Sequence, residues 1–195
     1  MPQLWLPGYV QAGLMWDAEH CPDPLPGGFI ACMAYFAGSS AAHVWDADEI
    51  DRVKAASLGI LPVCVPTPGT DNPLTAAQEL IDRLHAEGVP DNHACHVMWD
   101  METGKEPDPR WLDKAADRVR AAGYLNLVYG SPSTLFNQPP RDGYVVANPT
   151  NQIHMYERAH VRATQYAFDV RAPGGLIDQS AIASDLVAEL WHPGG

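Results

Sequence analysis

"HVMWDMETG" (residues 96–104) is an apolar run that ends in two carboxylates separated by a single residue. In a β-strand, successive side chains point to opposite faces. One face of this strand carries His96, Met98, Asp100 and Glu102. The other face carries Val97, Trp99 and Met101, which suit packing against outer helices. Two acids about 7 Å apart along one face repel each other unless something uses them. The stretch therefore predicts a buried strand with a candidate reaction site at its end.

Short apolar runs alternate with amphipathic stretches on both sides of this strand. The predicted strands are residues 28–38, 60–69, 94–102, 124–131, 143–150 and 162–170. The predicted helices are residues 46–59, 75–88, 108–123 and 185–191. In the second helix, Thr75 is the expected N-cap and Gly88 the expected end. Strands that alternate with helices indicate an α/β protein with parallel strands joined by right-handed crossovers.

The connections late in the chain favour a barrel over an open doubly wound sheet. Residues 131–143 and 150–162 are too short or too rich in proline for full helices. No glycine-rich nucleotide-binding motif follows any predicted strand. We therefore predict a single α/β domain over residues 1–195, a (β/α) TIM-like barrel with irregular, helix-poor later units.

The composition limits the partners of this domain. The 195 residues include 24 acidic and 12 basic side chains, which give a net charge of -12, and 46% of the residues are hydrophobic. This balance is typical of a soluble globular protein. It argues against binding to nucleic acid or to an anionic membrane, and it offers no electrostatic attraction to an anionic bacterial wall.

The cysteines and the N-terminus predict neither a metal or disulfide framework nor a secretion signal. Cys21, Cys32, Cys64 and Cys95 form no CxxC pair, so we expect them to be small buried hydrophobes. The N-terminus lacks the features of a signal peptide, and no apolar run is long enough to span a membrane. The prediction is a chain made in the cytoplasm, whose action outside the cell would need a phage-like or other non-classical route.

The acidic strand end admits three interpretations. In a parallel barrel, reacting groups lie at the C-terminal ends of the strands, where Asp100 and Glu102 are expected. Neighbouring carboxylates whose pKa values are pushed apart suit glycoside cleavage, because one of them stays protonated as a general acid. An acidic loop start without function is the second interpretation, and a Mg²⁺ or Ca²⁺ site is the third. No other potential metal ligand lies at a characteristic sequence spacing from this pair, so we predict neither a metal nor a cofactor.

The order of four segments resembles that of the family 25 glycoside hydrolases, the bacterial and phage muramidases. "HVMWDMETG" resembles the family's strand with the D-x-E pair, and "LNLVYGSPSTL" (125–135) the strand after it. "GYVVANPT" (143–150) and "RATQYAFDVRAPGGLIDQSAI" (162–182) are similar to its last strands. The four matches cover roughly residues 94–183. The resemblance implies a (β/α) barrel that cleaves β-1,4 bonds of an N-acetyl amino-sugar polymer, peptidoglycan.

The same resemblance implies the roles of individual residues. Glu102 corresponds to the proton donor, Asp100 to the acid that assists the substrate N-acetyl group, and Asp178 to the acid of the last strand. The residues expected to line the substrate cleft or lie beside these acids are Tyr129, Asn148, Gln165 and Tyr166. The implied partner is a cell-wall glycan or another amino-sugar polymer.

One acid of the family pattern is missing from its expected place. The family opens on a strand that carries an Asp after a Gly and one further residue, but here Val10 follows Gly8-Tyr9. Asp17 comes too late in the sequence unless the first strand is displaced. Asp17 or Asp169 could otherwise fill this place.

Two hypotheses about the function therefore stay open. One is a muramidase; the other is a non-catalytic carbohydrate-binding or structural module of a phage or surface assembly.

Overall fold

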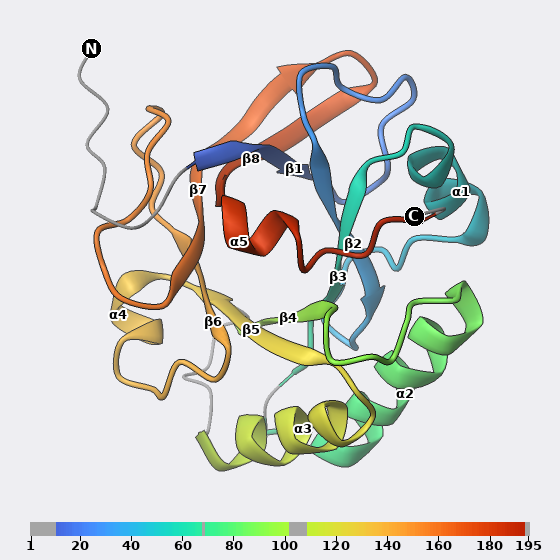
Figure 1. The fold of residues 1–195 in the computed structure, drawn as a ribbon, viewed down its shortest axis with the longest axis vertical. Helices are drawn as coiled ribbons and strands as arrows, with labels where there is room; N and C mark the ends of the chain where they lie inside the picture. Colours follow the sequence, from blue (N-terminus) through green and yellow to red (C-terminus); the bar gives the residue numbers. More distant parts are fainter. Residues whose placement is uncertain (1–10, 68, 102–108, 194–195) are drawn as a thin grey trace.

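The computed structural model describes residues 11–67, 69–101 and 109–193, and within them the chain forms a closed barrel of eight strands (Figure 1). The strands, in both chain order and barrel order, are β1 (Gln11–Asp17), β2 (Ala31–Ala37), β3 (Gly59–Cys64), β4 (His96–Asp100), β5 (Leu125–Gly130), β6 (Gly143–Ala147), β7 (Val161–Ala172) and β8 (Gly175–Ala183). The helices are α1 (Ala47–Ala55), α2 (Pro73–Glu87), α3 (Pro109–Ala121), α4 (Pro132–Leu135) and α5 (Ser184–Val187). The predicted α/β barrel is confirmed.

The predicted parallel strands are found in β1 to β7, whereas the last strand differs. β1 to β7 follow one another in parallel pairs, whereas β8 runs antiparallel to both β7 and β1. Only Pro173 and Gly174 separate β7 from β8, and Gly174 has a φ of 86°. A parallel neighbour needs a crossover of a dozen residues or more, so this short connection forces a hairpin.

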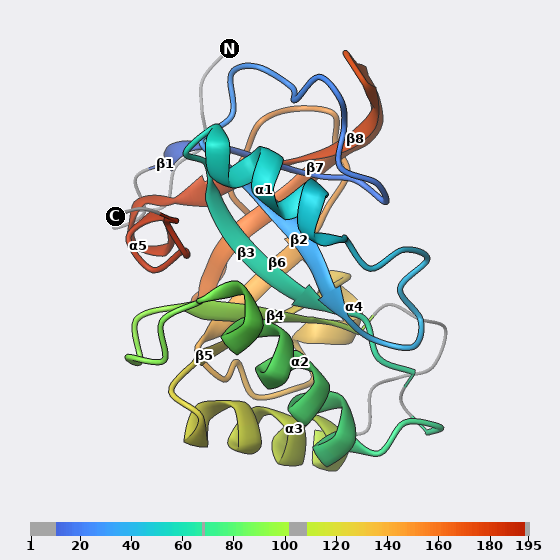
Figure 2. The same cartoon turned by 90° about the vertical axis from the view of Figure 1, so that its right-hand side faces the viewer.

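The helices are concentrated in the first half of the chain. Figure 1 shows α1, α2 and α3 around one side of the barrel, and Figure 2 shows α2 and α3 side by side. The later α4 and α5 have only four residues each. The helix-poor later units are therefore as predicted. The segment after α5 closes the N-terminal end of the barrel, where the Ile60 amide donates to the Trp191 carbonyl over 2.8 Å.

The helix ends follow local capping chemistry. The carboxylate of Asp46 accepts the Glu49 amide, and the Glu49 carboxylate accepts the Asp46 amide, which forms a capping box at the start of α1. α2 begins earlier than predicted, because Asn72 rather than Thr75 is its N-cap and Pro73 occupies the first turn. Gly88 ends α2 in the left-handed conformation, as predicted.

Two apolar layers hold the barrel together. The interior layer includes Met98 of β4, and the layer between the barrel and its helices includes Val97 and Trp99. Trp99 packs edge-on against Trp111 of α3 with ring centres 5.9 Å apart. The alternation predicted for this strand is thus confirmed for its described residues. It leaves Asp100 at the strand end on the same side as Met98.

The four cysteines are free and buried, as expected for small hydrophobes. Burial raises the pKa of the Cys21, Cys32, Cys64 and Cys95 thiols, so thiolate chemistry is suppressed. Within the described part of the chain, no helix is both long enough and apolar enough to cross a bilayer.

Candidate active site

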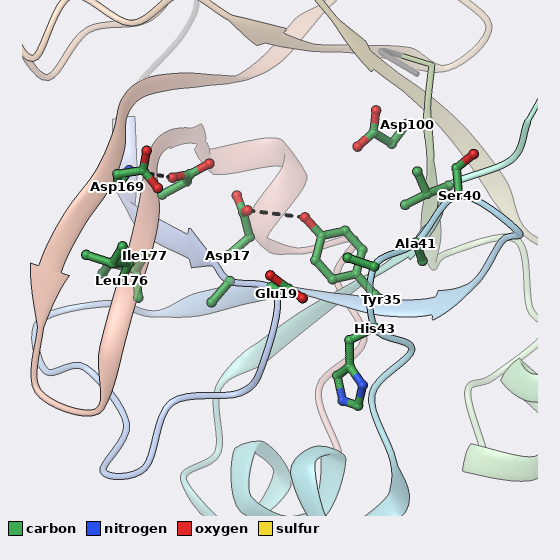
Figure 3. A pocket seen from close by; sticks show the side chains of 14 residues that line it. Asp17, Glu19, Tyr35, Ser40, Ala41, His43, Asp100, Asp169, Leu176 and Ile177 are labelled. Atoms are coloured by element: carbon green, nitrogen blue, oxygen red, sulfur yellow. Dashed lines mark hydrogen bonds between the residues drawn. The ribbon is translucent and has the colours of Figure 1, made fainter. Parts of the chain in front are cut away.

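Three aspartates from strands far apart in the sequence meet at one end of the barrel. Asp17 ends β1, Asp100 ends β4, and Asp178 lies in the first half of the reversed strand β8. All three line a pocket of about 450 Å³ and a smaller adjoining hollow of about 200 Å³. Figure 3 shows the Asp17 carboxylate next to the Tyr35 hydroxyl, and Asp100 on the other side of that hydroxyl. The reversed β8 starts at the end of the barrel where the parallel strands finish, which explains why its acid joins theirs.

Asp17 is the acid that the sequence analysis could not place. The first strand is displaced along the chain relative to the expected one, and Asp17 is its last residue. It lies directly opposite Asp178 in the antiparallel β1–β8 pair. Burial raises the pKa of Asp17 well above its usual range, and the charges of Asp178 and Asp100 raise it further. The expectation that the first strand lacks an acid is therefore wrong.

Gln165 of β7 joins two of these acids. Its Nε2 donates to Asp178 Oδ2 over 2.8 Å and lies 3.2 Å from Asp17 Oδ2. Its Oε1 accepts a short hydrogen bond from the Tyr129 hydroxyl, which fixes the orientation of the amide. Gln165 is only 2% exposed. Of the four predicted substrate-binding residues, Gln165 and Tyr129 thus reach the site, where they hold the carboxylates.

Asp178 receives a second hydrogen bond from the β7–β8 hairpin. Its Oδ1 accepts the backbone amide of Asp169 over 2.8 Å. Asp169 adopts a φ of 51°, and its carboxylate lines the same pocket. Burial raises the pKa of Asp178, and the Asp169 amide partly offsets this rise. Asp169 is therefore an additional acid at the site and does not replace Asp17.

Tyr35 of β2 is a site residue that the sequence analysis missed. Its hydroxyl lies 3.5 Å from Asp17 Oδ1 and lines both hollows. Burial, followed by the charges of Asp17, Asp100 and Asp178, raises the pKa of Tyr35, so the phenol stays protonated as a donor. The run "ACMAYFA" gave no polar signal except this tyrosine, which is also an ordinary core residue.

The remaining predicted site residues differ in position. Glu102, the predicted proton donor, lies outside the described residues. Asn148 follows β6, and its side chain lies 3.0 Å from Nε2 of His154, away from the residues that line the two hollows. Tyr166 packs in the outer apolar layer and donates to Gln179 Oε1 over 2.8 Å, so the structure does not bring it to the pocket.

The pocket is strongly acidic. Its carboxylate residues are Asp17, Glu19, Asp100, Asp169 and Asp178. Among the described lining residues, His43 is the one basic side chain, and neither lysine nor arginine is present. A site of this kind can stabilise positive charge that develops on a bound molecule, and it can donate or accept protons through groups with raised pKa values.

The comparisons with known proteins identify the fold. No protein-family model and no curated protein matches the sequence. An uncharacterized B. stearothermophilus protein superposes with a TM-score of 0.70 and 16% identity, over 92% of this chain and 100% of that one. A glycosyl hydrolase 25 of Streptococcus pneumoniae gives a TM-score of 0.69 and 10% identity, over 89% and 88% of the two chains. A muramidase from Trichobolus zukalii gives a TM-score of 0.61 and 14% identity, over 91% of this chain and 99% of that one.

The chain therefore has the barrel fold of the family 25 glycoside hydrolases. The resemblance noted in the sequence is confirmed at the level of the fold. At these low identities the likeness extends to the arrangement of the strands, and the activity has to be argued from the site.

Proposed function

We propose that this protein is a muramidase-type glycoside hydrolase that cleaves β-1,4 bonds of an N-acetyl amino-sugar polymer, with peptidoglycan as its target. The observation that carries the proposal is the meeting of Asp17, Asp100 and Asp178 in one pocket at the strand ends. A buried group of carboxylates suits a reaction whose transition state carries positive charge on a sugar ring. The muramidase likeness of the fold supports the same reaction.

In this proposal, Glu102 protonates the glycosidic oxygen while the bond from that oxygen to C1 breaks. The acetamido oxygen of the same sugar attacks C1, and Asp100 accepts the acetamido N–H and offsets the positive charge of the cyclic intermediate. Water then attacks C1 and gives its proton to Glu102, while the bond from the acetamido oxygen to C1 breaks. This step regenerates the acetamide, restores the acid and retains the configuration at C1. Asp100 suits its role because it ends β4 and lines the pocket.

Asp17 and Asp178 line the same pocket as Asp100. Their raised pKa values favour protonation of the pair, and protonation limits the repulsion in a site with several acids. A non-catalytic binding module on the same barrel was suggested by the missing acid of the first strand. Asp17 supplies an acid there, so that reason no longer applies.

The test is the hydrolysis of purified bacterial cell walls by the wild-type chain, Glu102→Gln and Glu157→Gln. Glu157 is exposed and remote from the pocket, which makes it a matched control. Wild type and Glu157→Gln should release new reducing sugar ends, while Glu102→Gln should release fewer by a factor of about 100 or more. Equal release by Glu102→Gln and wild type would remove Glu102 from the mechanism. No release from walls of several chemotypes would leave the binding-module hypothesis in its place.

A further inference from the structure

A second group of titratable side chains lies at the edge of the pocket and has no role in the proposed reaction. His20 follows β1, His43 precedes α1, and Glu49 belongs to the first turn of α1. Nε2 of His43 lies 2.6 Å from Oε2 of Glu49, and the two imidazole rings face each other with centres 4.1 Å apart. One potential ligand atom from each residue lies within 4.8 Å of the other two. Among the described residues, this is the one group of three His, Cys, Asp or Glu side chains with potential ligand atoms so close together.

We propose that His20, His43 and Glu49 bind a divalent transition-metal ion, and that Zn²⁺ is the ion that fits best. Two imidazoles and one carboxylate are ligands that Zn²⁺ accepts, in a set that leaves a fourth position for water. Mg²⁺ and Ca²⁺ prefer oxygen ligands, so two histidines select against them. This proposal concerns binding and does not depend on the glycosidase activity.

The geometry needs a modest rearrangement around the ion, in which His43 and Glu49 move apart and His20 moves closer. Ligand atoms of a tetrahedral zinc lie about 3.3–3.5 Å apart, given bonds of about 2.0–2.2 Å. The His43–Glu49 pair is already closer than this, so the ion would take the place of the shared proton. His20 has to approach, and its side chain is 66% exposed. Both rings must be neutral to offer lone pairs, and two imidazolium rings in face contact would repel each other.

Glu49 is held as a preformed ligand. Its Oε1 accepts the Cys21 amide and its Oε2 accepts the Asp46 amide, each over 2.9 Å. Such outer hydrogen bonds orient a ligand and raise the affinity for a metal. Although burial acts to raise it, hydrogen bonds from His43 and from these backbone amides lower the pKa of Glu49. The carboxylate is therefore available in its charged form.

A bound ion would join two loops that form one wall of the pocket. His20 is next to Glu19 in the chain and His43 is next to Ala42, and both neighbours line the pocket. His43 itself lines the pocket as well, and Figure 3 shows it with Glu19. A metal crosslink between these loops would restrict the motion of this wall of the pocket. The ion would not bind the aspartates of the pocket. The expected consequence is a more stable fold in the presence of the metal, because the ion binds only the native arrangement.

The first experiment is a titration of the metal-free chain, without a polyhistidine tag, with Zn²⁺ by calorimetry. Wild type should bind one equivalent, and Co²⁺ in its place should give the intense visible absorption of a tetrahedral site. His20→Ala and Glu49→Gln should each weaken binding by at least about tenfold, which is the low end of the loss seen even for outer partners. Glu49→Gln suits this purpose because glutamine also serves in a capping box, so the start of α1 is preserved.

His192→Ala is the control, because His192 is exposed and remote from the group. It should bind Zn²⁺ as wild type does. Circular dichroism of each variant shows whether the barrel is folded, so that lost binding is not confused with unfolding. The proposal is overturned if folded wild type shows no saturable binding below about 1 mM Zn²⁺. Binding by His20→Ala and Glu49→Gln as tight as wild type would also overturn it, because the ion would then lie elsewhere.

Discussion

Asp17 and Asp178 face each other across the β1–β8 pair and share the side-chain amide of Gln165. The amide is neutral, so it satisfies both carboxylates without compensating their charge. Two ionised carboxylates directly opposite each other in an antiparallel pair repel. Burial raises the pKa of both acids, and the charge of Asp178 adds to the rise for Asp17. Burial and mutual repulsion therefore both favour the protonated form of this pair.

Removal of the Tyr129 hydroxyl should impair this arrangement more than it impairs the fold. In Tyr129→Phe, Gln165 loses the donor that fixes its amide, so the two carboxylates lose their fixed positions. We expect cell-wall hydrolysis to slow by about 10- to 100-fold, the range caused by small misplacements in active sites. The free energy of unfolding should fall by only about 1 kcal/mol.

Tyr124→Phe is the matched control for this change. The Tyr124 hydroxyl is also buried and donates to the Val89 carbonyl, but it lies away from the pocket. Its loss should cost about the same stability, about 1 kcal/mol, without slowing hydrolysis. Equal rates for both variants would show that Gln165 holds its orientation without Tyr129.

Asp17→Asn should stabilise the protein near neutral pH. The pKa of Asp17 is raised in the folded state, so the stability linked to its proton is complete below the unfolded value of 3.8 and is lost as pH rises through the folded value. Asparagine stays neutral throughout and escapes this loss. Urea unfolding should show the variant gaining on wild type as pH increases from about 4 to 7.

Exposed Asp117 offers the control for that series, because Asp117→Asn should leave the pH profile of stability unchanged. If Asp17→Asn instead lost stability at pH 7, then Asp17 would be ionised in the native protein and held by its hydrogen bonds. In that case Tyr35 and Gln165 would outweigh the burial of the carboxylate.

The sequence predicts those features of the barrel that depend on neighbouring residues in the chain. The acidic strand end, its inward and outward faces and the scarcity of late helices all follow from alternation, proline content and loop length. Asp17 could not be placed in this way, because "QAGLMWD" has no distinctive flanking turn and its first half is not an apolar run. The family pattern of an acid shortly after a glycine fits residues 8–10 instead, where Val10 stands.

The hydrogen bonds of the site depend on closure of the barrel. Asp17 and Gln165 are 148 residues apart in the chain and become neighbours only when β7, β8 and β1 close the sheet. A single sequence predicts that a glutamine is present but not which side chains it joins. For the same reason, the sequence predicts Gln165 and Tyr129 as substrate ligands, whereas in the structure they bond to each other and Gln165 bonds to Asp178.

Asn126 should be a major determinant of stability outside the site. It is 0% exposed, accepts the indole N–H of Trp99 over 2.9 Å and donates to the Ala116 carbonyl of α3 over 3.2 Å. Asn126→Ala leaves the buried indole N–H of Trp99 without its acceptor and removes the additional hydrogen bond to the Ala116 carbonyl. Urea unfolding should therefore show a loss of about 2–4 kcal/mol. Exposed Asn137→Ala should change stability by no more than about 0.5 kcal/mol. A loss that small for Asn126→Ala would mean that water replaces the amide.

His96 lies at the start of β4, at the end of the barrel opposite the pocket. We expect its titration to make the fold less stable in acid. The side chain is 1% exposed, neither ring nitrogen has a hydrogen-bond partner among the described residues, and Nδ1 lies 3.3 Å from Oε2 of Glu189. Burial lowers the pKa of His96 to about 4; the nearby charge of Arg162 adds to this, while Glu189 opposes it. Since the unfolded value is 6.5, the stability linked to neutral His96 is complete above pH 6.5 and is lost as pH falls toward 4. The loss should reach about 3 kcal/mol.

His96→Met removes this titration and keeps an apolar side chain of suitable length in the barrel. The difference in unfolding free energy between wild type and His96→Met should therefore change in favour of the variant as pH falls from about 7 to 4. His85→Ala, at an exposed position on α2, should follow wild type across the same range. A constant difference between wild type and His96→Met would show that Glu189 compensates the imidazolium fully. The ion pair at 3.3 Å, rather than burial, would then set the charge of His96.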